Sequence, residues 1–352
     1  MMRVALGQLP EASDASLDFA RQLGLSSIQF NTPNLPGERR WEYDDLVALR
    51  ERCGAAGLTL EAIENIPTHF YMRAMLGKPG RDEDIENVVA TIRNVGRAGI
   101  PTLGYHFMPA SVWRTSISAP GRGGAVVTAY DHAIAVDPAR AEEVYIAWRD
   151  LARDDPFIRA TQFDLGVELD DDAMWANYRY FMEAVVPVAE EANVRLALHP
   201  DDPPVEQLGG VARLFRSVAN LRKATELVPS PNAGFDLCLG TVSEMGGEQA
   251  VLEAIETLGP PGRIFYVHLR DVKGVSPRFE ECFIGEGNYD PLRVLRTLRR
   301  VGFDGFILDD HVPRMVDDTD YMHRGRAHAI GYIQGLLQAI ASESEQQEEA
   351  GQ

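Results

Sequence analysis

Residue types that bind divalent metals recur where short apolar segments of this sequence end. His199, Cys238 and His268 each stand near the end of such a segment, and Asp310–His311 closes a fourth. Imidazole, thiolate and carboxylate together suit a borderline divalent ion such as Mn²⁺, Fe²⁺, Co²⁺ or Zn²⁺. The C-terminal ends of the strands in a (β/α)8 barrel meet at one face, where such barrels carry their chemistry. The spacing therefore predicts a metal-dependent enzyme.

The neighbours of the two histidines suit a binding site better than a core. His199 opens the segment His-Pro-Asp-Asp-Pro-Pro, a polar, proline-stiffened loop directly after an apolar run. His268 is followed by Arg270 and Lys273, which could hold a substrate carboxylate. Asp271 or a backbone carbonyl could fix the tautomer of His268. The alternatives are a buried structural histidine, an inert strand cysteine and solvated loop charges.

The segment Asp309–Asp310–His311 could divide two tasks between neighbouring residues. A strand alternates its faces, so either Asp309 or Asp310 could be the metal ligand. His311 is the natural general acid or base, because its ordinary pKa lies close to neutrality. The alternative is that His311 itself binds the metal and an aspartate supports it.

Other polar residues near strand ends are weaker candidates. His69 and His106 follow the third and fourth expected strands and would face the barrel mouth. Tyr321, Arg314 and Arg326 lie just past the last strand. Structural or surface positions are expected for the remaining histidines and the two other cysteines, which are His132, His323, His328, Cys53 and Cys282.

Eight short β-rich segments must position these side chains. They cover residues 4–8, 27–31, 59–65, 102–107, 196–199, 233–238, 264–269 and 306–309. Helical patterns lie between them, such as the apolar stripe of Trp175, Tyr178, Met182, Val185 and Ala189 at spacings of three and four. This alternation predicts one (β/α)8 TIM-barrel domain over residues 1–340. A doubly wound open sheet is the alternative, but no G-x-G-x-x-G motif follows the first segment.

Two segments interrupt the regular alternation. Residues 109–170 form an insertion with a glycine-rich loop (Gly121, Gly123, Gly124) and an expected helix over 138–153. Long insertions in barrels often form lids or oligomer contacts, so we expect a homo-oligomer, either a dimer or a tetramer. Residues 341–352 are polar and acidic and are expected to be disordered.

The composition excludes several classes of partner. The chain has 34 Lys and Arg residues against 53 Asp and Glu residues, a net charge of −19. Such a surface argues against nucleic acid or an anionic membrane, and an anionic substrate would need a local basic pocket. No apolar stretch approaches the roughly 18 residues of a membrane span. Three cysteines make no disulfide framework and the N-terminus shows no signal peptide, so we expect a cytoplasmic enzyme.

Eight stretches, in order along the chain, resemble the mannonate dehydratase family, which comprises metal-dependent lyases of the xylose-isomerase-like barrel superfamily. They are GLTLEAIENIPTH (57–69), GRDEDIENVVATIRNVGRAGIP (80–101), YHFMP (105–109), LHPDDPP (198–204), GFDLCLG (234–240), RIFYVHLRDVK (263–273), FEECFIGEGNYD (279–290) and DDH (309–311). The resemblance implies a TIM barrel that binds Mn²⁺, or alternatively Fe²⁺ or Co²⁺, with no organic cofactor. The implied metal ligands are His199, Cys238, His268 and Asp310.

The resemblance also implies an activity, the dehydration of D-mannonate or a closely related sugar acid to 2-keto-3-deoxy-D-gluconate and water. It implies His311 and Tyr321 as catalytic residues. Residues considered for binding the sugar acid are His69, His106, Arg270, Lys273 and Arg314. The chain departs from the family pattern after His69 and over residues 312–328, which bears on substrate identity more than on metal binding. The alternatives are a sugar or sugar-acid isomerase or epimerase on the same barrel, and a non-catalytic paralogue that binds metal and sugar acid.

Overall fold

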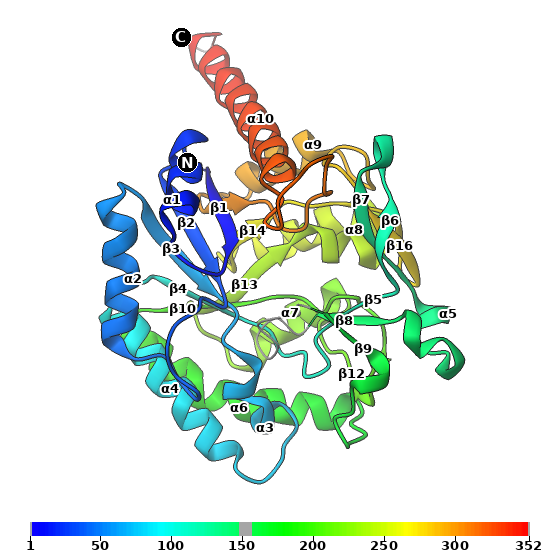
Figure 1. Cartoon of the computed structure of the whole chain (residues 1–352). Coiled ribbons are helices and arrows are strands. Elements are labelled where there is room, and N and C mark those ends of the chain that lie inside the picture. The colour runs from blue at the N-terminus through cyan, green and yellow to red at the C-terminus, as the bar shows by residue number, and fades with distance from the viewer. Residues whose placement is uncertain (1, 148–156, 351–352) are drawn as a thin grey trace.

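Eight parallel strands close into a barrel in the computed structural model, which describes residues 2–147 and 157–350. Around the barrel the order is β1, β2, β3, β4, β10, β13, β14 and β17 (Figure 1). Their bounds are Arg3–Leu9, Ser27–Asn31, Thr59–Glu64, Thr102–Tyr105, Arg195–Leu198, Ala233–Cys238, Ile264–His268 and Phe306–Leu308. The expected (β/α)8 barrel is confirmed, and each expected strand segment overlaps one of these strands.

Helices cover the outside of the barrel and begin at residues that suit helix N-termini. Ser13 and Ser217 accept hydrogen bonds from backbone N–H groups of the first turns of α1 and α7. Asp170 does the same for α6, and Asp290 for α9, where Pro291 follows at the first helical position. The main helices are α1 (Asp14–Gln22), α2 (Tyr43–Ala55), α4 (Arg81–Arg97), α6 (Asp171–Ala192), α7 (Val218–Leu227), α8 (Leu239–Leu258), α9 (Pro291–Arg300) and α10 (His323–Ala350).

The interior of the barrel is filled by large side chains that face small ones. Tyr266 stacks on Phe306 with 4.8 Å between ring centroids. Small residues on facing strands leave room for these rings; Ala62 and Ala197 belong to the same buried cluster. A side chain at Gly104 would meet the Tyr266 hydroxyl at 2.7 Å. Packing therefore brings the Tyr266 hydroxyl close to β3 and β4, below the strand ends that carry the site.

The insertion after β4 folds mainly as strands. β5 (Val112–Arg114), β8 (Tyr145–Ala147) and β9 (Phe157–Arg159) form one antiparallel sheet. β6 (Ser116–Pro120) and β7 (Val126–Asp131) join β15 (Val272–Val275) and β16 (Arg278–Glu281), which follow barrel strand β14, in another. The helix expected over 138–153 was wrong in its first part. Residues Pro138–Glu143 form a 3₁₀ helix, and β8 then pairs with β5, because sheet pairing overrides local helical preference. Residues 148–153 lie outside the described residues.

The last helix replaces most of the disordered tail expected at 341–352. α10 runs from His323 to Ala350 and projects away from the barrel (Figure 1). Arg296 of α9 pairs with Glu343 of α10, which holds the helix beyond the expected domain boundary. The Glu, Gln and Ala residues of this segment are good helix formers, so a polar composition here does not exclude a helix.

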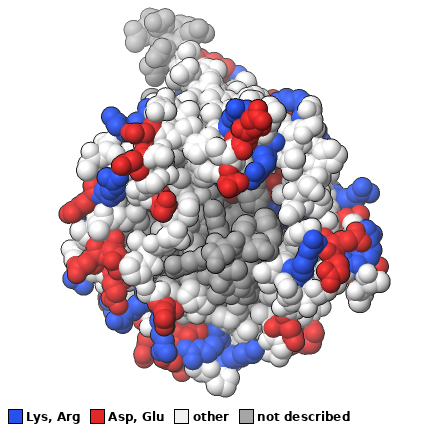
Figure 2. Space-filling view, viewed as in Figure 1, with Lys and Arg blue, Asp and Glu red and all other residues white. Residues whose placement is uncertain are grey.

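Charged residues of both signs surround the face shown in Figure 2. Acidic and basic side chains are interspersed around its rim. Within the described residues, no helix is long and apolar enough to span a membrane.

Candidate metal centre and active site

Four donor side chains meet at the C-terminal ends of four neighbouring barrel strands. Cys238 and His268 are the last residues of β13 and β14 and lie opposite each other in the register of the two strands. His199 follows β10 directly, and Asp310 follows β17. One donor atom from each residue lies within 4.8 Å of the others, and all four residues are buried. Ligand atoms about 2.0–2.3 Å from one ion lie at comparable separations, so the geometry fits a single metal ion.

Hydrogen bonds orient the two imidazoles toward this cluster. Nδ1 of His199 donates to the carbonyl of Pro200 at 2.7 Å, which leaves Nε2 for the cluster. Nε2 of His268 lies 2.9 Å from Glu64 Oε2 and 3.2 Å from Asp236 Oδ2. Nδ1 of His268 is buried and has no hydrogen-bond partner among the described residues, and it lies 3.7 Å from Asp310 Oδ2. An unshared nitrogen lone pair aimed at three other donors is what a metal ligand requires.

The ionisation of the cluster also suits a cation. Burial would raise the pKa of the Cys238 thiol, but the charge of Arg270 and contacts with His199 and His268 lower it well below its ordinary value. The thiolate is the form that binds metals. Burial alone would lower the pKa of His199, but the hydrogen bond and charge of Cys238 raise it to about 10. The anionic donors thus favour positive charge at this point, which a bound metal ion would supply in place of the protons on the imidazoles.

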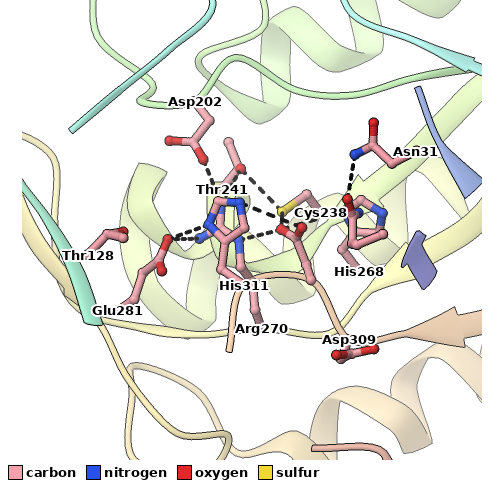
Figure 3. A network of polar contacts seen from close by, with 12 residues as sticks. Asn31, Thr128, Asp202, Cys238, Thr241, His268, Arg270, Glu281, Asp309 and His311 are labelled. Carbon is pink, nitrogen blue, oxygen red and sulfur yellow. Dashed lines mark hydrogen bonds and ion pairs between the residues drawn. The ribbon is translucent and has the colours of Figure 1, made fainter. Parts of the chain in front are cut away.

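The two neighbouring aspartates have different partners, and Figure 3 shows Asp309 apart from Cys238 and Arg270. Oδ2 of Asp310 accepts a 2.7 Å hydrogen bond from Nε of Arg270 and lies 3.8 Å from Sγ of Cys238. Oδ2 of Asp309 instead accepts a 2.7 Å hydrogen bond from Nη1 of Arg326. The strand register, which the sequence left open, thus directs Asp310 to the cluster and Asp309 to a supporting ion pair.

Arg270 forms the centre of a buried ionic network. Its guanidinium donates to Asp310, to Glu244 at 3.0 Å and to Asp202 at 2.7 Å, and its side chain is only 2% exposed. Asp202 in turn receives two hydrogen bonds from Arg114 of the insertion, at 2.6 and 2.8 Å. The sequence suggested Arg270 as a binder of the substrate carboxylate. In the structure its hydrogen bonds go to carboxylates of the chain itself, among them that of Asp310.

His311 lies beside the cluster, and one of its ring nitrogens contacts the carboxylate of Glu281. Its Nδ1 lies 2.6 Å from Glu281 Oε1, and its Nε2 lies 3.7 Å from Asp310 Oδ1. The side chain is 41% exposed, whereas that of Glu281 is 7% exposed. Burial works against the imidazolium, but Asp310 and Glu281 outweigh it and raise the pKa of His311 above its ordinary value. This arrangement of a buried carboxylate, an imidazole and open space suits proton transfer.

The remaining candidate residues differ in their exposure and in their hydrogen-bond partners. The Tyr321 hydroxyl donates to the carbonyl of Gly7 in β1 at 2.6 Å. His106 is buried, with Nε2 3.2 Å from the Thr68 hydroxyl, and His69 is exposed in the same region. Lys273 is 44% exposed and pairs with Glu286. Arg314 is 43% exposed and pairs with Asp320. The sequence analysis considered both as binders of the sugar acid; in the structure both are partly exposed and paired with a carboxylate.

Sequence reasoning missed several charged residues of the site, among them Glu64, Asp236, Glu281 and Arg114. Asp236 stands two residues before Cys238, so both side chains lie on the same face of β13. A charged residue at this spacing within an apolar strand was a usable indication. Glu64 similarly ends an apolar strand. Glu281 and Arg114 gave no such indication, because they come from the sheets formed by the insertion and by the segment after β14.

Comparison with known proteins adds a family to this geometry. The family model described as D-mannonate dehydratase (UxuA) matches residues 2–347. The chain belongs to the mannonate dehydratase family. The mannonate dehydratase of Thermotoga neapolitana is 31% identical over 351 residues, covering 94% of this chain and 95% of that protein. Mannonate dehydratase 2 of Halalkalibacterium halodurans is 28% identical, covering 97% of this chain and 100% of its own length.

Solved structures agree with this family assignment. The crystal structure of mannonate dehydratase from Streptococcus suis serotype 2 superposes with a TM-score of 0.81 at 28% identity, covering 98% of this chain and 96% of that one. D-psicose 3-epimerase from Clostridium cellulolyticum H10 superposes with a TM-score of 0.60 at 13% identity. At that identity the epimerase shares the fold alone.

Proposed function

We propose that this member of the mannonate dehydratase family is a metal-dependent hydro-lyase that converts D-mannonate into 2-keto-3-deoxy-D-gluconate and water. The observation that carries the proposal is the convergence of His199, Cys238, His268 and Asp310 beside the open imidazole of His311. The mixed thiolate, imidazole and carboxylate set favours Mn²⁺, Fe²⁺ or Co²⁺ over Mg²⁺. When bound, such an ion would stabilise the negative charge that develops on substrate oxygens as the C2 proton leaves.

The residues of the chain supply proton transfer and positioning. The reaction removes a proton from C2 and needs a proton for the departing C3 hydroxyl. We assign one of these transfers to His311, since Glu281 holds its Nδ1–H and leaves Nε2 facing the site. We assign the other to Tyr321, which lies past β17 with its hydroxyl at β1. Solvent exchange separates the roles: replacement of the base abolishes exchange of the C2 hydrogen with D₂O, and replacement of the acid does not.

The test is a metal-dependent screen over six-carbon aldonic acids. Metal-stripped protein is reconstituted separately with Mn²⁺, Fe²⁺, Co²⁺ and Mg²⁺, and formation of a 2-keto-3-deoxy acid is measured. Turnover of D-mannonate with a thiolate-tolerant metal is the expected result. Interconversion of reducing sugars without loss of water would overturn it in favour of an isomerase or epimerase. Binding of metal and sugar acid without turnover would indicate a non-catalytic paralogue.

The insertion over 109–170 supports a proposal about assembly. We infer that it contributes to contacts in a homo-oligomer, because its strands form one small antiparallel sheet and part of another outside the barrel. Light scattering coupled to size-exclusion chromatography tests this inference. A monomer at micromolar concentration would contradict it.

A further inference from the structure

A second carboxylate lies behind the metal centre, on the side of His268 that faces away from Asp310. Glu64, the last residue of β3, is 2% exposed. Its Oε2 lies 2.9 Å from Nε2 of His268, while Nδ1 of the same ring faces Asp310. One nitrogen of His268 therefore faces the cluster of metal donors, and the other faces a carboxylate outside that cluster.

The surroundings of Glu64 supply its buried carboxylate with hydrogen-bond donors. Gln29 of β2 donates to its Oε2 at 2.5 Å, and the Tyr266 hydroxyl of β14 lies 3.4 Å from the same atom. Side-chain amides of Gln8, Asn31 and Asn65 lie 3.3–3.5 Å from its oxygens. A buried charge is costly unless such donors surround it, so this network of polar side chains from four strands stabilises the carboxylate itself.

The amide groups also hold each other in place. Nδ2 of Asn31 donates to the side-chain oxygen of Gln8, and Nδ2 of Asn65 donates to that of Asn31 at 3.1 Å. Gln8 and Asn65 have positive φ values of 61° and 59°, which non-glycine residues rarely adopt. Backbone conformations of this kind persist where the surroundings fix them, often at functional sites. Three adjacent strand ends are thus shaped around Glu64.

We propose that Glu64 is a positioning residue for the metal centre and that it acts through His268. Glu64 accepts the Nε2–H of His268 and so fixes the tautomer in which Nδ1 carries the lone pair. Asp236 Oδ2 lies 3.2 Å from the same nitrogen, but among the described residues it has no hydrogen-bond partner. The negative charge of Glu64 makes Nδ1 a stronger electron donor, as in other carboxylate–histidine–metal arrangements. The inference rests on the proposed metal centre and extends it by one residue, Glu64.

Metal affinity of Glu64→Gln and Glu64→Leu tests the proposal without any substrate. Titration calorimetry with Mn²⁺ should show a loss of affinity of about 10–100-fold for Glu64→Gln, and a larger loss for Glu64→Leu, which cannot accept a hydrogen bond. In the protein loaded with Zn²⁺, which is diamagnetic, long-range ¹H–¹⁵N spectra should show His268 protonated at Nε2 alone, and a mixture of tautomers in Glu64→Leu. Gln29→Met removes a donor to Glu64 but touches no proposed ligand. It should also weaken Mn²⁺ binding, but by less than the Glu64 variants.

Glu61→Gln is the matched control on the same strand. Glu61 is also a buried carboxylate of β3, but it pairs with Arg3 at the other end of the barrel. Its replacement should leave Mn²⁺ affinity unchanged. Wild-type affinity in folded Glu64→Gln and Gln29→Met would overturn the proposal, as would two Mn²⁺ ions per chain, because Glu64 and Asp236 would then be ligands. Failure of the wild-type chain to bind metal would refute the proposed metal centre itself.

Discussion

Replacement of Arg114 by methionine should destabilise the folded chain by about 3 kcal/mol, although Arg114 belongs to the insertion rather than to the barrel. Its side chain is 1% exposed and makes a two-point ion pair with Asp202. It also donates to Glu281 at 3.0 Å. Removing one partner of a buried ion pair costs about 3–5 kcal/mol, because the remaining charge stays buried.

The structure places the expected cost at the lower end of that range. Asp202 keeps its 2.7 Å hydrogen bond from Arg270, and Glu281 keeps His311. Methionine also fills the volume of the aliphatic part of the arginine, which avoids a large cavity. The stability that is lost is therefore the electrostatic part of the interaction. Two carboxylates share this loss, and each of them retains one other partner.

The destabilisation should depend on pH in a defined direction. Burial would raise the pKa of Glu281, but His311, Arg114 and Arg270 lower it to about 2. A carboxyl group whose pKa is lower in the folded state stabilises the fold above its unfolded pKa, and this contribution is lost as the pH falls toward the folded value. The difference between wild type and Arg114→Met should therefore be largest above about pH 4.5 and should shrink as the pH falls toward 2.

Urea unfolding followed by circular dichroism, at pH 7 and at pH 3.5, measures both effects. Arg140→Met is the control, since Arg140 makes a two-point pair with Glu143 in the same insertion with both side chains exposed. Exposed pairs contribute about 0–1 kcal/mol. A loss in Arg114→Met no larger than in Arg140→Met, or one that grows on acidification, would refute the reasoning.

Three further predictions concern the site. His311→Asn should lower turnover by about 10²–10⁴-fold with metal content nearly intact, which parallel rate and metal analyses check; loss of both together would make His311 a ligand. Cys238→Ser should lose metal, measured by elemental analysis, whereas Cys53→Ser should retain it because Cys53 lies in helix α2; equal metal content in the two variants would contradict this. Lys273→Ala should change kcat/KM less than twofold, since its ammonium pairs with Glu286 at the surface; a loss above tenfold would return it to the substrate site.

The barrel and three of the donors, His199, Cys238 and His268, could be predicted because they follow from local patterns. Alternating strand and helix patterns specify the fold. A metal-binding residue at the end of a strand is then expected at the mouth of the barrel. The choice between Asp309 and Asp310 could not be made, because it depends on a one-residue register in a three-residue strand. Only the partners Arg270 and Arg326 distinguish the two carboxylates.

The features that could not be predicted depend on contacts between distant segments of the chain. Lys273 and Arg314 pair with carboxylates at the surface, whereas Arg270 pairs with buried ones. Which carboxylate lies near each of these residues is decided by the tertiary structure. Arg270 meets Asp202 and Glu244 only after three strand ends have assembled. The expected helix at 138–153 failed for a related reason: the partner of β8 is β5, about thirty residues earlier in the chain, as its register shows.

The pairing of β7 with β16 joins two segments that the sequence separates by about 150 residues. β7 comes from the insertion, and β16 carries Glu281 to His311. Tyr130 of β7 stacks on Phe279 of β16 with 5.6 Å between ring centroids. Neither segment can therefore be exchanged alone between related barrels without disturbing the carboxylate that orients His311. In recombination or in the grafting of loops between homologues, the two segments should be inherited together as one module.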